Sequence, residues 1–154
     1  SSAEVSRLRL IIVMSPWASC ILLFGAACAH PANLLVDSNC NRPLAEGTVI
    51  MGRAAMMSTD RTVYFQRHGS KMDCGSGYTP GETLTVAISD STGEQLFELS
   101  GGSFDGGSCA DSVRIVGSVG ATLTAPASGT LSVTAAFALE HGQVYITESC
   151  SLTG

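Results

Sequence analysis

Residues 83–88 read TLTVAI, in which apolar side chains alternate without a break with hydroxyl or small ones. A period of two places successive side chains on opposite faces of an extended chain, so this pattern predicts a strand with one buried face. The same alternation recurs in LSVT at 131–134 and in VYIT at 144–147. Three such segments in the second half of the chain indicate a domain built from β-strands.

Turn residues divide the sequence beyond residue 30 into short apolar stretches. Clusters such as TPG at 79–81 and STG at 91–93 supply the backbone angles and side-chain hydrogen bonds that tight turns require. The expected strands are Thr48–Ala54, Thr62–Arg67, Thr83–Ser89, Gln95–Ser100, Ser112–Gly117, Ala121–Ala125, Thr130–Leu139 and Gln143–Ser149. About eight strands at this spacing predict an all-β fold, an antiparallel two-sheet immunoglobulin-like sandwich.

Length and composition restrict the classes of protein to which the chain can belong. A chain of 154 residues suits one domain, and 45% hydrophobic with only 14% charged residues excludes intrinsic disorder. A net charge of −5 provides no basic stripe, so we expect no nucleic-acid partner. Neither a GxGxxG motif nor a P-loop occurs, and we expect no cofactor.

The first 29 residues have the pattern of a targeting segment. Arg7 and Arg9 precede an uncharged apolar run from Leu10 to Cys28, and the run closes on the small-residue motif ACA at 27–29. A basic start, an apolar middle and a small-residue exit are typical of a secretory signal peptide. Cleavage after this motif would leave residues 30–154 as one secreted domain.

The same segment supports a second interpretation, in which it is retained as one hydrophobic N-terminal helix before the sandwich. Residues 8–28 are long enough to cross a bilayer core of about 30 Å, and Pro16 does not forbid such a span. A lipoprotein acylated at Cys28 is a third possibility. In every case residues 30–154 lie outside the cytoplasm, either secreted or membrane-anchored.

The cysteines of the domain fit an oxidising compartment. Four of the six cysteines lie beyond the apolar run: Cys40, Cys74, Cys109 and Cys150. Their wide spacing lacks the close pairs typical of zinc sites and predicts two structural disulfides, with three possible pairings. A bridge between Cys40 and Cys150 would join the two ends of the domain.

Two segments resemble a known extracellular family. Residues 78–86, YTPGETLTV, are similar to the Y-x-P-G-x-x-x-x-V entry strand of reeler (reelin N-terminal-like) domains. LTAP at 123–126 and GTLSVTA at 129–135 are similar to that family's closing W-x-x-P … G-x-V-x-F-x-A hairpin, with Leu123 in place of Trp. The resemblance would cover residues 40–150. It implies an extracellular immunoglobulin-like module that binds other proteins and carries no catalytic residues.

Two sets of residues are candidate metal ligands. A mature N-terminus at His30 could chelate copper together with His68 or His141, as in copper-dependent polysaccharide oxygenases. The glycine-rich loop 101–111 carries Asp105 and Asp111, whose carboxylates could contribute to a calcium site. Both sets have a simpler interpretation as exposed turn residues, and we expect no resident metal.

These observations favour a non-enzymatic binding or structural module displayed outside the cytoplasm. Its expected partners are other proteins, whether matrix components, cell-surface proteins or subunits of a membrane complex. Two alternatives remain open at this point. If residues 8–28 are retained, the chain is a single-span accessory subunit of a larger membrane complex, with its sandwich on the lumenal face. If His30 binds copper, the chain is an oxidative enzyme.

Overall fold

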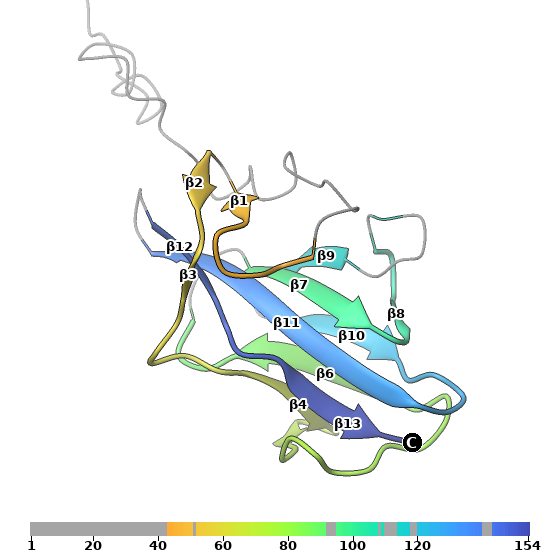
Figure 1. Ribbon diagram of the computed structural model, residues 1–154. Helices are drawn as coiled ribbons and strands as arrows, with labels where there is room; N and C mark the ends of the chain where they lie inside the picture. Colours follow the sequence, from red (N-terminus) through yellow and green to blue (C-terminus); the bar gives the residue numbers. More distant parts are fainter. Residues whose placement is uncertain are drawn as a thin grey trace, which may run out of the picture.

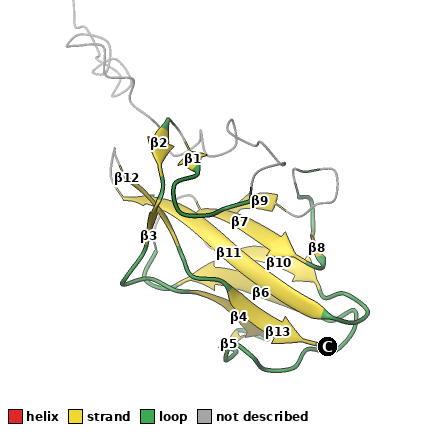
Figure 2. Ribbon diagram, in the orientation of Figure 1, coloured by secondary structure: helices red, strands yellow, loops and turns green. Residues whose placement is uncertain are grey.

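A computed structural model describes residues 43–50, 52–91, 95–107, 109, 114–117, 120–139 and 143–154. Within these ranges the chain forms β-strands and no helix, which confirms the predicted all-β class (Figure 2). The strands are β1 (Val49–Ile50), β2 (Arg53–Ala54), β3 (Met56–Met57), β4 (Val63–Arg67), β5 (Ser70–Lys71), β6 (Thr83–Ile88), β7 (Gln95–Ser100), β8 (Ser103–Phe104), β9 (Arg114–Gly117), β10 (Ala121–Thr124), β11 (Thr130–Leu139), β12 (Gln143–Ile146) and β13 (Cys150–Thr153).

Five strands form an antiparallel sheet in the order β5-β4-β6-β10-β8. The TLTVAI segment becomes its central strand β6, flanked by β4 and β10. The predicted alternation decides which side chains face inward: Leu84 and Val86 are buried, whereas Thr83 is exposed and Thr85 is half-buried. We call this the five-stranded sheet.

Six strands form a second sheet around β11, the longest strand of the described chain. One edge of β11 pairs with β7, and the other edge is shared by β12 and β13. Thr147 bridges the junction between β12 and β13: its backbone N–H donates to the Ala135 carbonyl oxygen at 2.9 Å. Its hydroxyl oxygen accepts from the Ala135 N–H at 3.2 Å, so the pairing of β11 continues where the neighbouring strand is interrupted.

The two sheets pack face to face, and Figure 1 shows β11 crossing in front of β6 and β10. The inner core between them draws buried side chains from both sheets, including Phe65, Val86, Leu123, Phe97, Leu131, Val133 and Leu152. Each large apolar side chain buried in this way stabilises the fold by about 1.5–3 kcal/mol relative to an exposed one. The inner core therefore fixes the relative position of the two sheets.

A smaller outer cluster covers the far face of the six-stranded sheet. Leu44 and Ile50, from the segment around the β1–β2 hairpin, pack there against Leu96 and Ile146. The backbone N–H of Leu44 donates to the Glu98 carboxylate at 2.9 Å. The segment before β3 is thus attached to the sheet by both apolar and polar contacts.

The structure corrects several sequence-predicted boundaries. The strand expected at Thr48–Ala54 is a hairpin, because Gly52 adopts a φ of 74° and the chain turns back on itself. The strand predicted at Gln143–Ser149 ends at Ile146, and a separate strand that was not predicted, β13, begins at Cys150. The short strands β3, β5 and β8 were not predicted, since each has only two residues and is defined by its partner.

The predicted leader or anchor, residues 1–29, lies outside the described residues, and so does the expected hydrophobic helix. In the part of the chain that the structure describes, no helix has the length and apolar character needed to span a membrane.

Candidate functional site

One of the expected disulfides is present and joins Cys74 to Cys150. Of the pairings left open by the sequence, this bridge excludes the one that would join Cys40 to Cys150. The reason lies in the segment 75–78, which runs alongside β13: the Gly75 N–H donates to the Ser151 carbonyl at 2.6 Å. This pairing brings the Cα atoms of Cys74 and Cys150 to 5.3 Å. Cys109 is also disulfide-bonded, and Cys40 lies outside the described residues.

The candidate metal ligands are only partly described. His68 occupies the two-residue turn between β4 and β5, exposed and with a φ of 51°, as expected for a turn histidine. Asp105 is exposed in the turn after β8. His30, His141 and Asp111 lie outside the described residues, so the copper and calcium sets are not tested. Across the described ranges, no group of three or more His, Cys, Asp or Glu side chains is arranged to hold a metal ion.

An ion pair fixes the turn that leads into β6. Arg67 donates two hydrogen bonds to the Glu82 carboxylate, from Nε at 2.9 Å and from Nη2 at 2.7 Å. The Thr79 N–H also donates to this carboxylate at 2.9 Å. The hydrogen bonds from Arg67 are the main reason why the pKa of Glu82 lies below its ordinary value, and burial opposes them. The arrangement positions the 79–82 turn and has a structural role.

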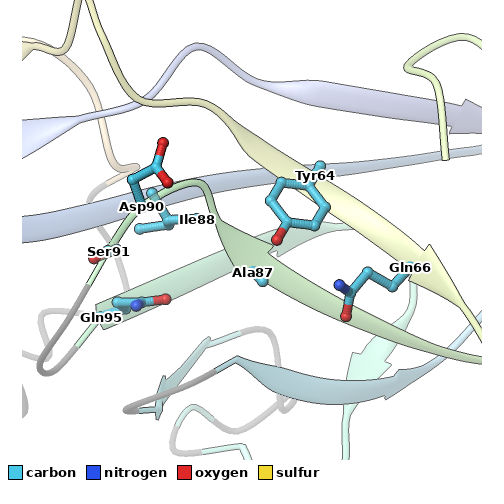
Figure 3. Close-up of a pocket in the computed structure, with 7 residues that line it drawn as sticks. All are labelled: Tyr64, Gln66, Ala87, Ile88, Asp90, Ser91 and Gln95. Atoms are coloured by element: carbon cyan, nitrogen blue, oxygen red, sulfur yellow. The ribbon is translucent and has the colours of Figure 1, made fainter. Parts of the chain in front are cut away.

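A cavity of about 520 Å³ opens where β6 ends and the chain turns toward β7. We call it the β6–β7 cavity. Its lining residues are Tyr64, Gln66, Ala87, Ile88, Asp90, Ser91 and Gln95 (Figure 3). Its volume lies within the range of about 300–1,000 Å³ typical of small-molecule sites, but it is open to solvent and its lining is more polar than apolar.

Strand pairing explains how the side chains of the cavity come together. Tyr64 on β4 lies directly opposite Ala87 on β6, on the other side of the strands from buried Val63 and Phe65. Beyond β6, reciprocal contacts hold the strand ends together: the Ser89 N–H donates to the Thr62 carbonyl at 2.9 Å, and the Thr62 N–H donates to the Ser89 hydroxyl at 3.0 Å. In Figure 3 the Tyr64 hydroxyl points toward Ala87.

Two buried polar atoms of this cavity lack hydrogen-bond partners in the described structure: Gln95 Oε1 and Ser91 Oγ. Gln95 is only 1% exposed, although it begins β7 and lies opposite buried Phe137. A buried polar atom without a partner costs about 1–3 kcal/mol, so native proteins rarely keep one without a reason. In Figure 3 the Gln95 amide oxygen points toward the space beside Ala87.

The chain leaves β6 through a turn at Asp90, which adopts a φ of 49°. Aspartate tolerates this left-handed conformation in turns, as histidine does at His68. The two unpartnered polar atoms are therefore the feature that makes this cavity the candidate site.

The sequence pattern predicts the strands that carry Tyr64 and Gln95 and the turn at residues 91–93, but it indicates no ligand site there. The signal is weak, because both faces of QLFELS contain apolar residues and the inward orientation of Gln95 cannot be read from the pattern.

Comparison of the chain with protein-family models, with curated proteins and with solved structures found no match.

Proposed function

We propose that the chain is a non-enzymatic binding module that acts outside the cytoplasm and that the β6–β7 cavity is its ligand site. The observation that carries the proposal is the concavity of about 520 Å³ whose lining combines the Tyr64 ring with the polar side chains of Gln66 and Asp90.

The location outside the cytoplasm is supported by the disulfide between Cys74 and Cys150, which is compatible with an oxidising compartment. The basic and apolar pattern of residues 1–29 supports the same location. Together these two features support a secreted or membrane-anchored domain that is cross-linked by disulfides.

We also propose that the domain is an immunoglobulin-like sandwich related to reeler domains. Two packed, largely antiparallel sheets support the first part. The relation to reeler domains is supported by the position of YTPGETLTV at 78–86, which contains the turn into β6 and the first residues of that strand. It is also supported by GTLSVTA at 129–135, which forms the start of β11.

Chemical-shift mapping tests the ligand site. The ¹⁵N-labelled domain is titrated with neutral fragments, namely acetamide, N-methylacetamide, phenol and methyl glucoside. Binding is expected to shift the amide signals of Tyr64, Ala87, Ser91 and Gln95 and to leave the fragments chemically unchanged. Shifts confined to other parts of the domain, or no shifts with any fragment, would contradict the proposal.

Secretion tests the location. The chain is expressed with its own first 29 residues in a host that has an oxidising export pathway. The domain is expected outside the cytoplasm, with a peptide pair linked through Cys74 and Cys150. Recovery from the cytoplasm with both thiols reduced would show that the location is wrong.

A further inference from the structure

We infer that the second disulfide of the domain joins Cys40 to Cys109 and that it holds an N-terminal strap on the six-stranded sheet. The strap consists of residues 43–50 and 52–55, which contribute Leu44, Ile50 and Ala55 to the outer cluster. Three observations support this pairing: the bonded state of Cys109, the cysteines that remain as its partners, and the contacts that bring the strap close to β9. The pairing does not depend on the β6–β7 cavity or on any ligand there.

The partner of Cys109 must come from a small set of cysteines. Cys109 is disulfide-bonded and only 8% exposed, and the bridge described above uses two more of the six cysteines. Those left in the chain are Cys40 and the two of the apolar run, Cys20 and Cys28. Cleavage of the proposed leader after residue 29 would remove the last two. Cys40 would then be the one partner that the same chain can supply.

The Glu98 carboxylate holds the chain that follows Cys40 and the chain that follows Cys109 at one place. One carboxylate oxygen accepts from the Leu44 N–H at 2.9 Å, and the other accepts from Arg114 Nε. Leu44 follows Cys40 by four residues, and Arg114 follows Cys109 by five. An extended chain spans at most about 3.6 Å per residue, so the two cysteines lie within about 14 and 18 Å of these anchored residues. The Cα separation of about 4.4–6.8 Å that a disulfide requires is thus within reach of both.

The bridge would add a covalent attachment to a strap whose other attachments are non-covalent. Besides the Leu44 hydrogen bond, the Gln143 side-chain amide donates to the Ala54 carbonyl at 3.0 Å. Beneath the strap, the outer cluster keeps Leu96 and Ile146 buried, at 5% and 1% exposure. Lifting the strap would expose these apolar side chains to water, so a covalent link beside its first residue keeps this face of the sheet covered.

The bridge forms by thiol–disulfide exchange with a low-molecular-weight disulfide, such as oxidised glutathione, in the compartment that receives the domain. One cysteine thiolate attacks this disulfide, and one glutathione thiolate leaves. The other cysteine thiolate then attacks the mixed disulfide and displaces the second glutathione. Two protein thiols are thereby oxidised to one disulfide, and their two protons and two electrons end on two molecules of reduced glutathione.

Peptide mapping without reduction tests the pairing. The full chain is exported from a host with an oxidising pathway, free thiols are blocked with N-ethylmaleimide, and the protein is cut with a protease that cleaves before aspartate. The four cysteines of the domain then fall in four different peptides, residues 37–59, 73–89, 105–110 and 111–154. We expect 37–59 to be linked to 105–110, and 73–89 to 111–154. A link from 105–110 to residues 1–36 or to a second copy of the chain, or blocked free thiols at Cys40 and Cys109, would overturn the pairing.

Amide hydrogen exchange tests whether the bridge holds the strap. The variant C40A/C109A removes the bridge and leaves the inner core and the other disulfide in place. We expect the Leu44 amide to exchange at least about tenfold faster in this variant, while the amides of β11 keep their protection. C20A/C28A, which makes the same two changes in the apolar run, is the matched control and should behave as the wild type does in both experiments.

The outcomes are distinct from those of the proposed function. An unchanged exchange rate of the Leu44 amide in C40A/C109A would overturn the holding role, even with the bridge found by mapping. A loss of protection throughout β11 would show that the bridge supports the whole domain rather than the strap, and it would overturn that role as well. None of these results bears on ligand binding at the β6–β7 cavity, which the fragment titration decides.

Discussion

The Tyr78 hydroxyl donates a hydrogen bond of 3.1 Å to the carbonyl oxygen of Gly129, the residue just before β11. The same oxygen accepts from the Gly154 N–H at 2.9 Å. Tyr78 is buried, and its ring lies so close to Gly154 that a Cβ at that position would come within 2.3 Å of the ring. Three segments that are distant in sequence therefore converge on one tyrosine.

Removing the Tyr78 hydroxyl should measurably destabilise the domain. Tyr78→Phe keeps the ring and deletes one hydrogen bond to a backbone oxygen, and we expect a loss of about 1 kcal/mol in the free energy of unfolding. Urea denaturation followed by far-UV circular dichroism measures this loss. Tyr64→Phe is the control, since its half-buried ring lies at the surface cavity, and a change below about 0.5 kcal/mol is expected. If Tyr78→Phe lowers the free energy of unfolding no more than Tyr64→Phe does, the Tyr78 hydrogen bond makes no specific contribution to stability.

The disulfide should contribute more than any single hydrogen bond. Its cysteines are 76 residues apart, and cross-links of such long loops stabilise by about 2–5 kcal/mol. We expect the double variant C74A/C150A to lose that amount in denaturant unfolding. Alanine is preferable to serine, because Cys150 is 1% exposed and a serine hydroxyl would be buried there. Non-reducing peptide mapping of the wild type provides the check: a peptide linking Cys40 to Cys150 would refute the observed pairing.

The ion pair between Arg67 and Glu82 should make stability depend on pH. A carboxyl group with a lowered pKa in the folded state stabilises the fold above its unfolded pKa of about 4.5. That contribution disappears as the pH falls through the lower, folded value. We therefore expect the urea midpoint to decline below roughly pH 5, and to decline less steeply in Glu82→Gln. Glu148→Gln, at an exposed position, should follow the wild-type curve; a shallower curve in both variants would argue against Glu82 as the source.

A second ion pair links two strands of the six-stranded sheet. Glu98 and Arg114 are register partners on β7 and β9, and Arg114 is only 3% exposed. Arg114→Met removes the partner of a carboxylate that also accepts from the Leu44 N–H, and a loss of about 2–3 kcal/mol is expected. The value is below that for a fully buried pair, because the Glu98 side chain keeps 19% exposure. The double variant R114M/E98Q should lose less stability than the sum of the two single losses. If the two losses simply add, the pair is not coupled.

The fold was predictable where a strand carries its own pattern. Gln95–Ser100 and Thr130–Leu139 form strands with the predicted bounds, and the predicted Thr83–Ser89 differs from β6 by one residue. Each of these strands is at least six residues long and contributes several side chains to a core, so local alternation and tertiary burial agree.

Short strands were not predictable, because their partners define them. Met56–Met57 pairs in parallel with β12, about 90 residues later in the sequence, and nothing in two methionines indicates that contact. The candidate cavity was missed for a similar reason. It joins Tyr64 to Gln95 through the pairing of β4 with β6, and this register has no signature in either segment alone.

The position of β13 has a consequence for how the domain reaches its native state. Leu152 is fully buried in the inner core, yet β13 follows every other described strand in the order of synthesis. Until residues 150–153 arrive, half of one β11 edge stays open and Cys74 has no partner. Folding that waits for pairings this distant in sequence is slow, and open strand edges attract other chains. Chains truncated shortly before Cys150 would therefore present an open β11 edge and a free Cys74 thiol, which chaperones and proteases can recognise.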